Sequence, residues 1–178
     1  MARHAQFRIA GIPVRVEPTF LVVIGILGYL SQPVGRPFQW SILVSWMVVA
    51  FVSILLHELG HAVVFRRYGI RPSISIQGFG GVTTGSGQLS PGQHIFVSLA
   101  GPLSALILIG LPAAWIWQAG TITSDMGREV LYQVLWINIG WSVLNLLPIL
   151  PLDGGNVAMS VLDPFEVFEI EVWPLAEF

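Results

Sequence analysis

The sequence predicts a mainly α-helical, polytopic membrane protein with about four transmembrane helices and a small β-hairpin or sheet on the cytoplasmic side. Of its 178 residues, 54% are hydrophobic and 10% are charged, whereas soluble domains have about 25% charged residues. The mean hydropathy is +0.74. Long uncharged stretches alternate with short segments that are charged or rich in glycine. These three observations together are typical of a chain that crosses a bilayer several times.

Four apolar segments are candidates for crossing the bilayer. The first contains glycines that suit close helix packing or tilt, and the second has tryptophans towards one end and arginines at the other, as membrane interfaces favour. The third has a face of small residues for close approach to another helix, and prolines break the end of the fourth. The predicted spans are residues 19–31, 40–66, 94–118 and 130–150, in a core of residues 1–162 that is followed by a short acidic tail, residues 163–178.

Two segments outside the spans have the pattern of β-strands. Residues 7–17 alternate in part between polar and apolar side chains and are interrupted by Gly11 and Pro13, which predicts one or two short strands. Residues 70–87 combine period-two alternation with a glycine-rich turn, which predicts a hairpin between the second and third spans. This hairpin is either a connecting loop or an open strand edge that holds an extended peptide by β-augmentation.

The segment His57-Glu58-Leu59-Gly60-His61 places polar groups inside the second span. Residues i and i+4 share one face of a helix, so His57 and His61 can offer imidazole nitrogens to one metal ion. Glu58 lies about 100° further round the helix, where its carboxylate can act on a water molecule instead of binding the metal. Ionisable side chains inside an apolar span are costly, which indicates a functional site. The pattern alone also fits polar groups that satisfy one another in a protein interior.

Arginine positions predict the side of the membrane on which each loop lies. Arginines cluster before the first span and after the second, so the positive-inside rule places the N-terminus and the hairpin in the cytoplasm. Four spans then return Asp153 to the membrane face at which His57 and His61 lie. A catalytic zinc usually has three protein ligands. With no cysteine in the chain, Asp153 is favoured over Asp125, on the opposite face, and over Asp163, which can simply end a helical segment.

The alternatives around this site are weaker. The Asp153-Gly154 pair is also a sequence that forms turns without binding metal. His4 lies near the N-terminus, and His94 lies at a span boundary, where an interfacial position explains it.

Two motifs in this order resemble the signatures of the site-2 protease family of intramembrane zinc metalloproteases, in a minimal form without a PDZ or CBS module. One is His57-Glu58-Leu59-Gly60-His61, and the other is Asn145-Leu-Leu-Pro148-Ile-Leu-Pro151-Leu152-Asp153-Gly154, with Ser98-Leu-Ala-Gly101-Pro102 between them. The resemblance covers roughly residues 5–160. One departure is Ala105, because many members have asparagine at the corresponding position of the third span.

The resemblance implies a role for each matching residue. One catalytic Zn²⁺ is expected between spans two and four, bound by His57, His61 and Asp153, with Glu58 as the catalytic acid and base. Asn145 is expected to contact the substrate or the developing oxyanion, although an interhelical hydrogen bond is an alternative for it.

The implied activity is that of an intramembrane zinc metalloendopeptidase, which cleaves membrane-anchored proteins near the cytoplasmic face in regulated intramembrane proteolysis. The implied partners are the lipid bilayer and a single-span substrate, such as an anti-sigma factor or a membrane-tethered transcription regulator. The implied location is the cell membrane, multi-pass, with the active site opening to the cytoplasm.

Other partners and functions are less consistent with the sequence. A net charge of −2 without a basic excess argues against nucleic acid. A non-proteolytic zinc-binding or transport protein needs a continuous polar path, which the spans offer only sparsely. An inactive scaffold that binds membrane helices does not need Glu58 or Asp153.

Overall fold

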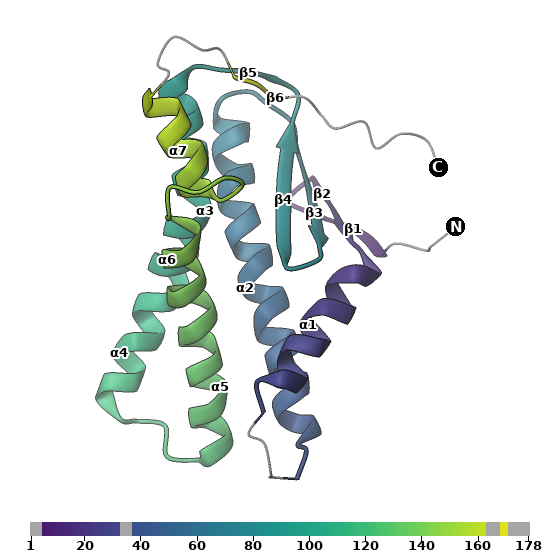
Figure 1. Cartoon of the computed structure of the whole chain (residues 1–178), viewed down its shortest axis with the longest axis vertical. Helices are drawn as coiled ribbons and strands as arrows, with labels where there is room; N and C mark the ends of the chain where they lie inside the picture. The colour runs from purple at the N-terminus through teal and green to yellow at the C-terminus, as the bar shows by residue number, and fades with distance from the viewer. Residues whose placement is uncertain (1–4, 33–36, 163–167, 171–178) are drawn as a thin grey trace.

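The computed structural model describes residues 5–32, 37–162 and 168–170. Over these residues long helices lie side by side, and a small sheet packs against them towards one end (Figure 1). The predicted class, mainly α with a small sheet, is thus confirmed. The helices are α1 (Pro18–Leu30), α2 (Trp40–Arg67), α3 (Pro91–Ala105), α4 (Leu111–Ala119), α5 (Asp125–Leu135), α6 (Trp141–Asn145) and α7 (Asp153–Leu162). Two π-helical turns, η1 (Leu106–Gly110) and η2 (Trp136–Gly140), join α3 to α4 and α5 to α6.

Two helical segments are long and apolar enough to cross a membrane. They are Trp40–Arg67, which is α2, and Pro91–Ala119, which runs from α3 through η1 to α4. Both lie where the second and third spans are predicted. The shorter helix α1 is apolar too, and it occupies the position of the first predicted span. Membrane crossing by these helices, and by the segment from α5 to α6, stays a prediction.

The last long helical segment begins and ends about five residues earlier than the predicted 130–150, because it runs from Asp125 to Asn145. Ser124 caps its N-terminus, where the side-chain oxygen accepts a hydrogen bond from the backbone N–H of Gly127 at 3.2 Å. Asp125 in the first turn interacts favourably with the helix dipole. At the other end, Pro148 disfavours helical geometry in the residue before it, so the helix ends upstream of this proline.

The predicted turn at Asp153 is instead the start of helix α7. An aspartate in the first turn of a helix is stabilised by the helix dipole, and the N–H of Asn156 bonds to the carbonyl of Leu152 at 3.1 Å. Gly154 and Gly155 are needed for close packing, because a Cβ at either position would overlap the backbone of the preceding loop, at Leu146 and Ile149 respectively. The two glycines therefore bring the start of α7 back against the end of α6.

Helices α2 and α3 pack closely along the predicted face of small residues. A Cβ at Gly60 of α2 would meet the backbone carbonyl oxygen of Ala100 at 2.5 Å. The Ser104 hydroxyl oxygen also lies 3.2 Å from the carbonyl oxygen of Leu56. A capping box of Ser90 and Gln93 starts α3 at Pro91, three residues before the predicted start of this span.

The sheet contains the predicted hairpin and the predicted N-terminal strands. Its order is β1 (Ala5–Ile9), β2 (Ile12–Val16), β3 (Pro72–Gln77) and β4 (Gly80–Gly85). All neighbours are antiparallel except β2 and β3, which pair in parallel. One face of the sheet is buried with residues of α1 and α2, and the cluster includes Ile12, Val14, Ile74, Ile76, Phe20, Ile24 and Ala62. Strand β4 lies at the edge of this sheet.

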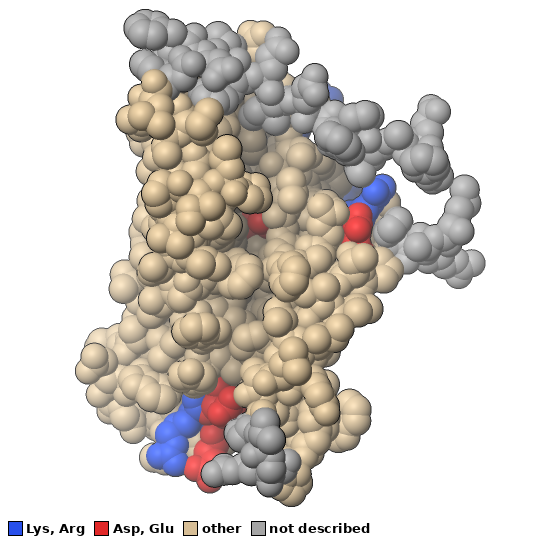
Figure 2. All heavy atoms as spheres, in the orientation of Figure 1, with Lys and Arg blue, Asp and Glu red and all other residues tan. Residues whose placement is uncertain are grey.

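Beyond the core, β5 (Gly87–Leu89) pairs antiparallel with β6 (Phe168–Ile170). The other residues of the predicted acidic tail, 163–167 and 171–178, lie outside the described residues. In the view of Figure 2, charged side chains are visible near the lower end of the molecule and at its right-hand side, and the rest of the described surface in this view is mostly uncharged. Acidic atoms are also visible in a hollow near the middle of this face.

Candidate metal centre

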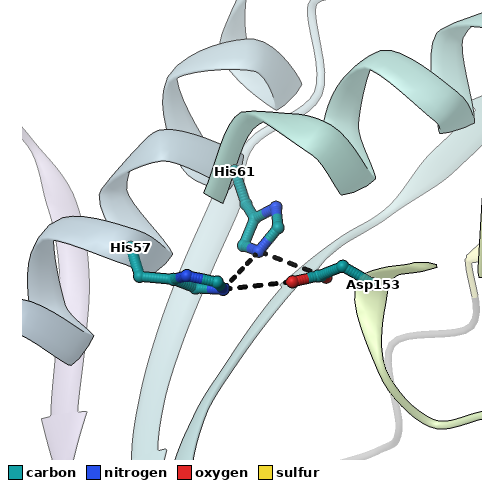
Figure 3. A group of neighbouring side chains, drawn as sticks. All are labelled: His57, His61 and Asp153. Atoms are coloured by element: carbon teal, nitrogen blue, oxygen red, sulfur yellow. Dashed lines mark hydrogen bonds and ion pairs between the residues drawn. The ribbon is translucent and has the colours of Figure 1, made fainter. Parts of the chain in front are cut away.

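Three potential metal ligands from two distant parts of the chain meet in one place. His57 and His61 lie one turn apart on α2, and Asp153 is the first residue of α7 (Figure 3). The Nε2 atoms of the two histidines are 3.1 Å apart. The carboxylate of Asp153 reaches both rings, with Oδ2 at 3.1 Å from His57 Nε2 and Oδ1 at 3.4 Å from His61 Nε2. Among the described residues these three form a group that could hold a metal ion.

The orientation of His61 is fixed by a backbone carbonyl on α3. His61 Nδ1 lies 2.7 Å from the carbonyl oxygen of Val97. A carbonyl oxygen can only accept, so Nδ1 carries a proton and Nε2 is the ring nitrogen that faces Asp153 and His57. A histidine that donates its second ring N–H in this way is typical of metal sites, because the bond sets the tautomer and the ring orientation.

The geometry fits a zinc ion. Ligand atoms that are each about 2.0–2.1 Å from a tetrahedral zinc lie roughly 3.3 Å from one another. The two histidine Nε2 atoms are 3.1 Å apart, and each of them lies 3.1 or 3.4 Å from a different oxygen of the Asp153 carboxylate. With one ligand atom from each residue, all three atoms lie within 4.8 Å of one another. Two imidazoles and one carboxylate are also a ligand set found in catalytic zinc sites, which keep one further position open. Gly101 of α3 makes space for the group, because a Cβ there would overlap His61 Nε2.

Glu58 lies beside this group and is 4% exposed. Its Oε2 accepts a hydrogen bond of 2.6 Å from the hydroxyl of Thr83 on β4. A Cβ at Gly81 would lie 2.7 Å from Glu58 Oε1, so the glycine keeps this side of the carboxylate unobstructed. Glu58 does not belong to the ligand group; it stands next to the group as a separate, oriented carboxylate.

All five predicted site residues line one cavity, which has a volume of about 440 Å³. Ligand pockets commonly have volumes of this order. Asn145, from the end of α6, is half-buried in its wall. Residues 80–83 of the edge strand β4 form another part of the wall. The cavity therefore brings together the group of His57, His61 and Asp153, the carboxylate of Glu58 and a strand edge.

The other aspartates and histidines lie elsewhere or have other partners. Asp125 is exposed and forms an ion pair with Arg128 at 2.7 Å, whereas His4 and Asp163 lie outside the described residues. His94 lies in the first turn of α3, at the predicted span boundary. Its ring lines the cavity, and Nδ1 lies 2.9 Å from the hydroxyl of Ser160. An interfacial position thus describes His94 incompletely, because its side chain turns towards the cavity.

Sequence reasoning misses the residues that orient the site. Thr83 and Val97 contact Glu58 and His61 across sequence separations of 25 and 36 residues. No local pattern indicates such long-range contacts. His94, which lines the cavity, differs from them because a local signal places it. The capping box at Ser90 and Gln93 determines where α3 starts and hence on which face of α3 His94 lies.

Comparison with known proteins agrees with this geometry. A family model described as "Putative zincin peptidase" matches residues 50–152. The chain is 32% identical over 157 residues to a zinc metalloprotease of Methanocaldococcus jannaschii, covering 88% of this chain and 44% of that protein. It is 32% identical over 166 residues to "Putative zinc metalloprotease Rip3" of Mycobacterium tuberculosis, covering 87% of this chain and 42% of that protein. The chain thus spans less than half the length of these two curated relatives.

The fold is similar to that of a solved structure, the site-2 protease from Methanocaldococcus jannaschii. The TM-score is 0.63 at 28% sequence identity, and the match covers 90% of this chain and 72% of that chain. The similarity therefore extends over most of this chain.

Proposed function

This chain belongs to the site-2 protease family of zincin-type zinc metalloproteases, and we propose that it hydrolyses peptide bonds of membrane-anchored proteins. One observation carries the proposal. A group of two histidines and one aspartate with the spacing of zinc ligands shares a cavity with a separate, buried glutamate. This combination supports hydrolysis, because zinc peptidases use a glutamate that does not bind the metal to move protons.

In this proposal His57, His61 and Asp153 hold the zinc ion. When bound there, zinc supplies Lewis-acid activation of a water molecule and of the scissile carbonyl. Glu58 accepts a proton from the attacking water as the new carbon–oxygen bond forms. It then delivers that proton to the amide nitrogen as the carbon–nitrogen bond breaks, which releases an amine and a carboxylic acid. Asn145 offers its amide N–H groups to the substrate or to the developing oxyanion.

The substrate reaches the cavity as an extended segment. The backbone bonds of a membrane helix are internally hydrogen-bonded, so the helix must unwind before hydrolysis. Strand β4 is an edge strand of the sheet and its residues 80–83 line the cavity. Main-chain groups at such an edge can pair with an incoming strand by β-augmentation. This favours the functional interpretation of the hairpin over that of a plain connecting loop.

The proposed location is the cell membrane, with several spans and with the cavity opening to the cytoplasm. Arg66 and Arg67 end α2 at the end of the molecule where α7 and β5 lie (Figure 1), and the positive-inside rule assigns this end to the cytoplasm. The proposed substrates are single-span proteins such as anti-sigma factors or membrane-tethered transcription regulators, cleaved in regulated intramembrane proteolysis.

The test is cleavage of a membrane-anchored peptide by the purified, zinc-loaded protein in liposomes. The Glu58→Gln variant keeps the shape of the side chain but cannot take up the proton, so it should retain zinc and lose cleavage. Glu129→Gln on α5, outside the cavity, is the matched control and should cleave like the wild type. Equal cleavage by wild type and Glu58→Gln, or no cleavage by zinc-loaded wild type of any membrane-anchored peptide tried, would count against the proposal.

A further inference from the structure

A single hydroxyl group on the sheet contacts the glutamate of the site. Thr83 Oγ1 lies 2.6 Å from Glu58 Oε2 and 3.1 Å from the backbone carbonyl oxygen of the same residue. A threonine hydroxyl has one proton and can donate it to one acceptor at a time. The shorter contact has the length of a hydrogen bond from a hydroxyl to a charged oxygen, which is the stronger kind. The hydroxyl therefore donates to the carboxylate.

The composition of β4 shows how unusual this contact is. In the strand register Gly81, Thr83 and Gly85 oppose Ile76, Ile74 and Pro72 of β3, and these three β3 residues are buried. The three β4 positions therefore share the inner face of the sheet. A Cβ at Gly81 would overlap Glu58, and one at Gly85 would lie 2.5 Å from Ile70.

Strand β4 thus lies so close to α2 at Gly81, and to Ile70 in the segment after α2 at Gly85, that a side chain at either of these inner positions would overlap its neighbour. Thr83 supplies the side chain at the third position, and its hydroxyl reaches the Glu58 carboxylate. A threonine needed only for packing would not have to aim its polar atom at a buried carboxylate.

We propose that Thr83 is a positioning residue that fixes the Glu58 carboxylate for proton transfer. The bond to Oε2 restricts rotation of the carboxylate and leaves Oε1 on the side of Gly81, where no side chain intrudes. This inference rests on the proposed function, and it adds a link between substrate binding at β4 and the position of Glu58. Thr83 belongs to the same edge strand that offers its backbone to the substrate. Pairing of a substrate strand with β4 would hold Thr83, and through it Glu58, in place.

The test compares three variants in the zinc-loaded chain of 178 residues. Thr83→Val keeps the branched shape and removes the hydroxyl; kcat should fall about 10- to 100-fold, and KM should stay within about twofold. Thr83→Ser restores the hydroxyl and should recover kcat to within about threefold of wild type. Ser73→Ala is the control, because it removes a hydroxyl hydrogen bond of 3.0 Å to Thr84 on the outer face of the sheet. Its kcat should equal that of the wild type.

A second readout does not depend on catalysis. The infrared carboxylate band of Glu58 is isolated by subtracting the spectrum of the matching Glu58→Gln protein, and it should shift in Thr83→Val but not in Ser73→Ala. An unshifted band, or a Thr83→Ser variant as slow as Thr83→Val, would overturn the positioning role. If the wild type cleaves no peptide, the proposed function fails, but the carboxylate band still shows whether the Thr83 hydroxyl contacts Glu58. Should Thr83→Val not fold, Thr83→Ala takes its place.

Discussion

Gly101 offers a sharp test of the metal centre, because it touches the site without being able to bind metal. A Cβ at this position would overlap His61 Nε2 and would lie 2.7 Å from His57 Nε2, about 0.7 Å inside the 3.4 Å at which ordinary van der Waals contact begins. The His61 ring cannot simply swing away, since its Nδ1 is held by Val97. The Gly101→Ala substitution therefore has to displace the imidazoles or move α3 away from α2.

A displacement of this size exceeds what a metal site tolerates. Ligand distances in working sites vary by about 0.2 Å, and disturbing the groups around the ligands costs about 10- to 100-fold in affinity. We expect Gly101→Ala to weaken zinc binding by at least about 100-fold, measured by competition with a chromogenic chelator in detergent, and to abolish cleavage in parallel.

The control is the same substitution where there is space. A Cβ at Gly25 of α1 would meet no atom within 4 Å, so Gly25→Ala should leave zinc affinity unchanged and stabilise the helix by up to about 1 kcal/mol. Alanine also has a higher helix propensity than glycine at position 101. A loss of zinc binding in Gly101→Ala therefore cannot result from a weakened helix. Wild-type zinc affinity in Gly101→Ala would refute the proposed arrangement of the histidines around the metal.

Two further predictions address the ligand set and the start of α3. Asp153→Asn removes the charge that faces both imidazoles and should lower zinc affinity by at least about tenfold in the chelator assay; unchanged affinity would exclude Asp153 as a ligand. Ser90→Ala removes the capping box of α3 and should lower the free energy of unfolding by about 1 kcal/mol, measured by reversible denaturation in detergent, with bound zinc content unchanged. A loss below about 0.3 kcal/mol would show that this cap is dispensable.

The fold can be predicted best where local sequence determines it. The predicted span 40–66 differs from α2 by one residue, because aromatic residues near one end and arginines at the other define its limits. Hydropathy places the segment from α5 to α6 about five residues too late, because it does not register the cap at Ser124. The parallel pairing of β2 with β3 joins strands on either side of two helices, and no local pattern encodes it.

Part of the candidate site can also be predicted from the sequence. The spacing of His57 and His61 follows directly from helix periodicity, and the distribution of arginines favours Asp153 over Asp125. The structure brings these residues together with Glu58 and Asn145 in one cavity, while their roles stay predictions. The sequence does not reveal the contacts that orient the site, namely the Val97 carbonyl and the Thr83 hydroxyl. These contacts arise from packing of α3 and β4 on α2, which hydrophobic periodicity does not specify.

The most direct test of the central claim is the cleavage rate at matched zinc content. Wild type and Glu58→Gln are reconstituted in liposomes with a membrane-anchored peptide, bound zinc is quantified in both, and the products are identified by mass spectrometry. We predict about one zinc per chain in both proteins, cleavage at a single region of the peptide by the wild type, and a rate at least about 100-fold lower in Glu58→Gln. Equal rates in the two zinc-loaded proteins would contradict the assignment of Glu58 as the proton-transferring group.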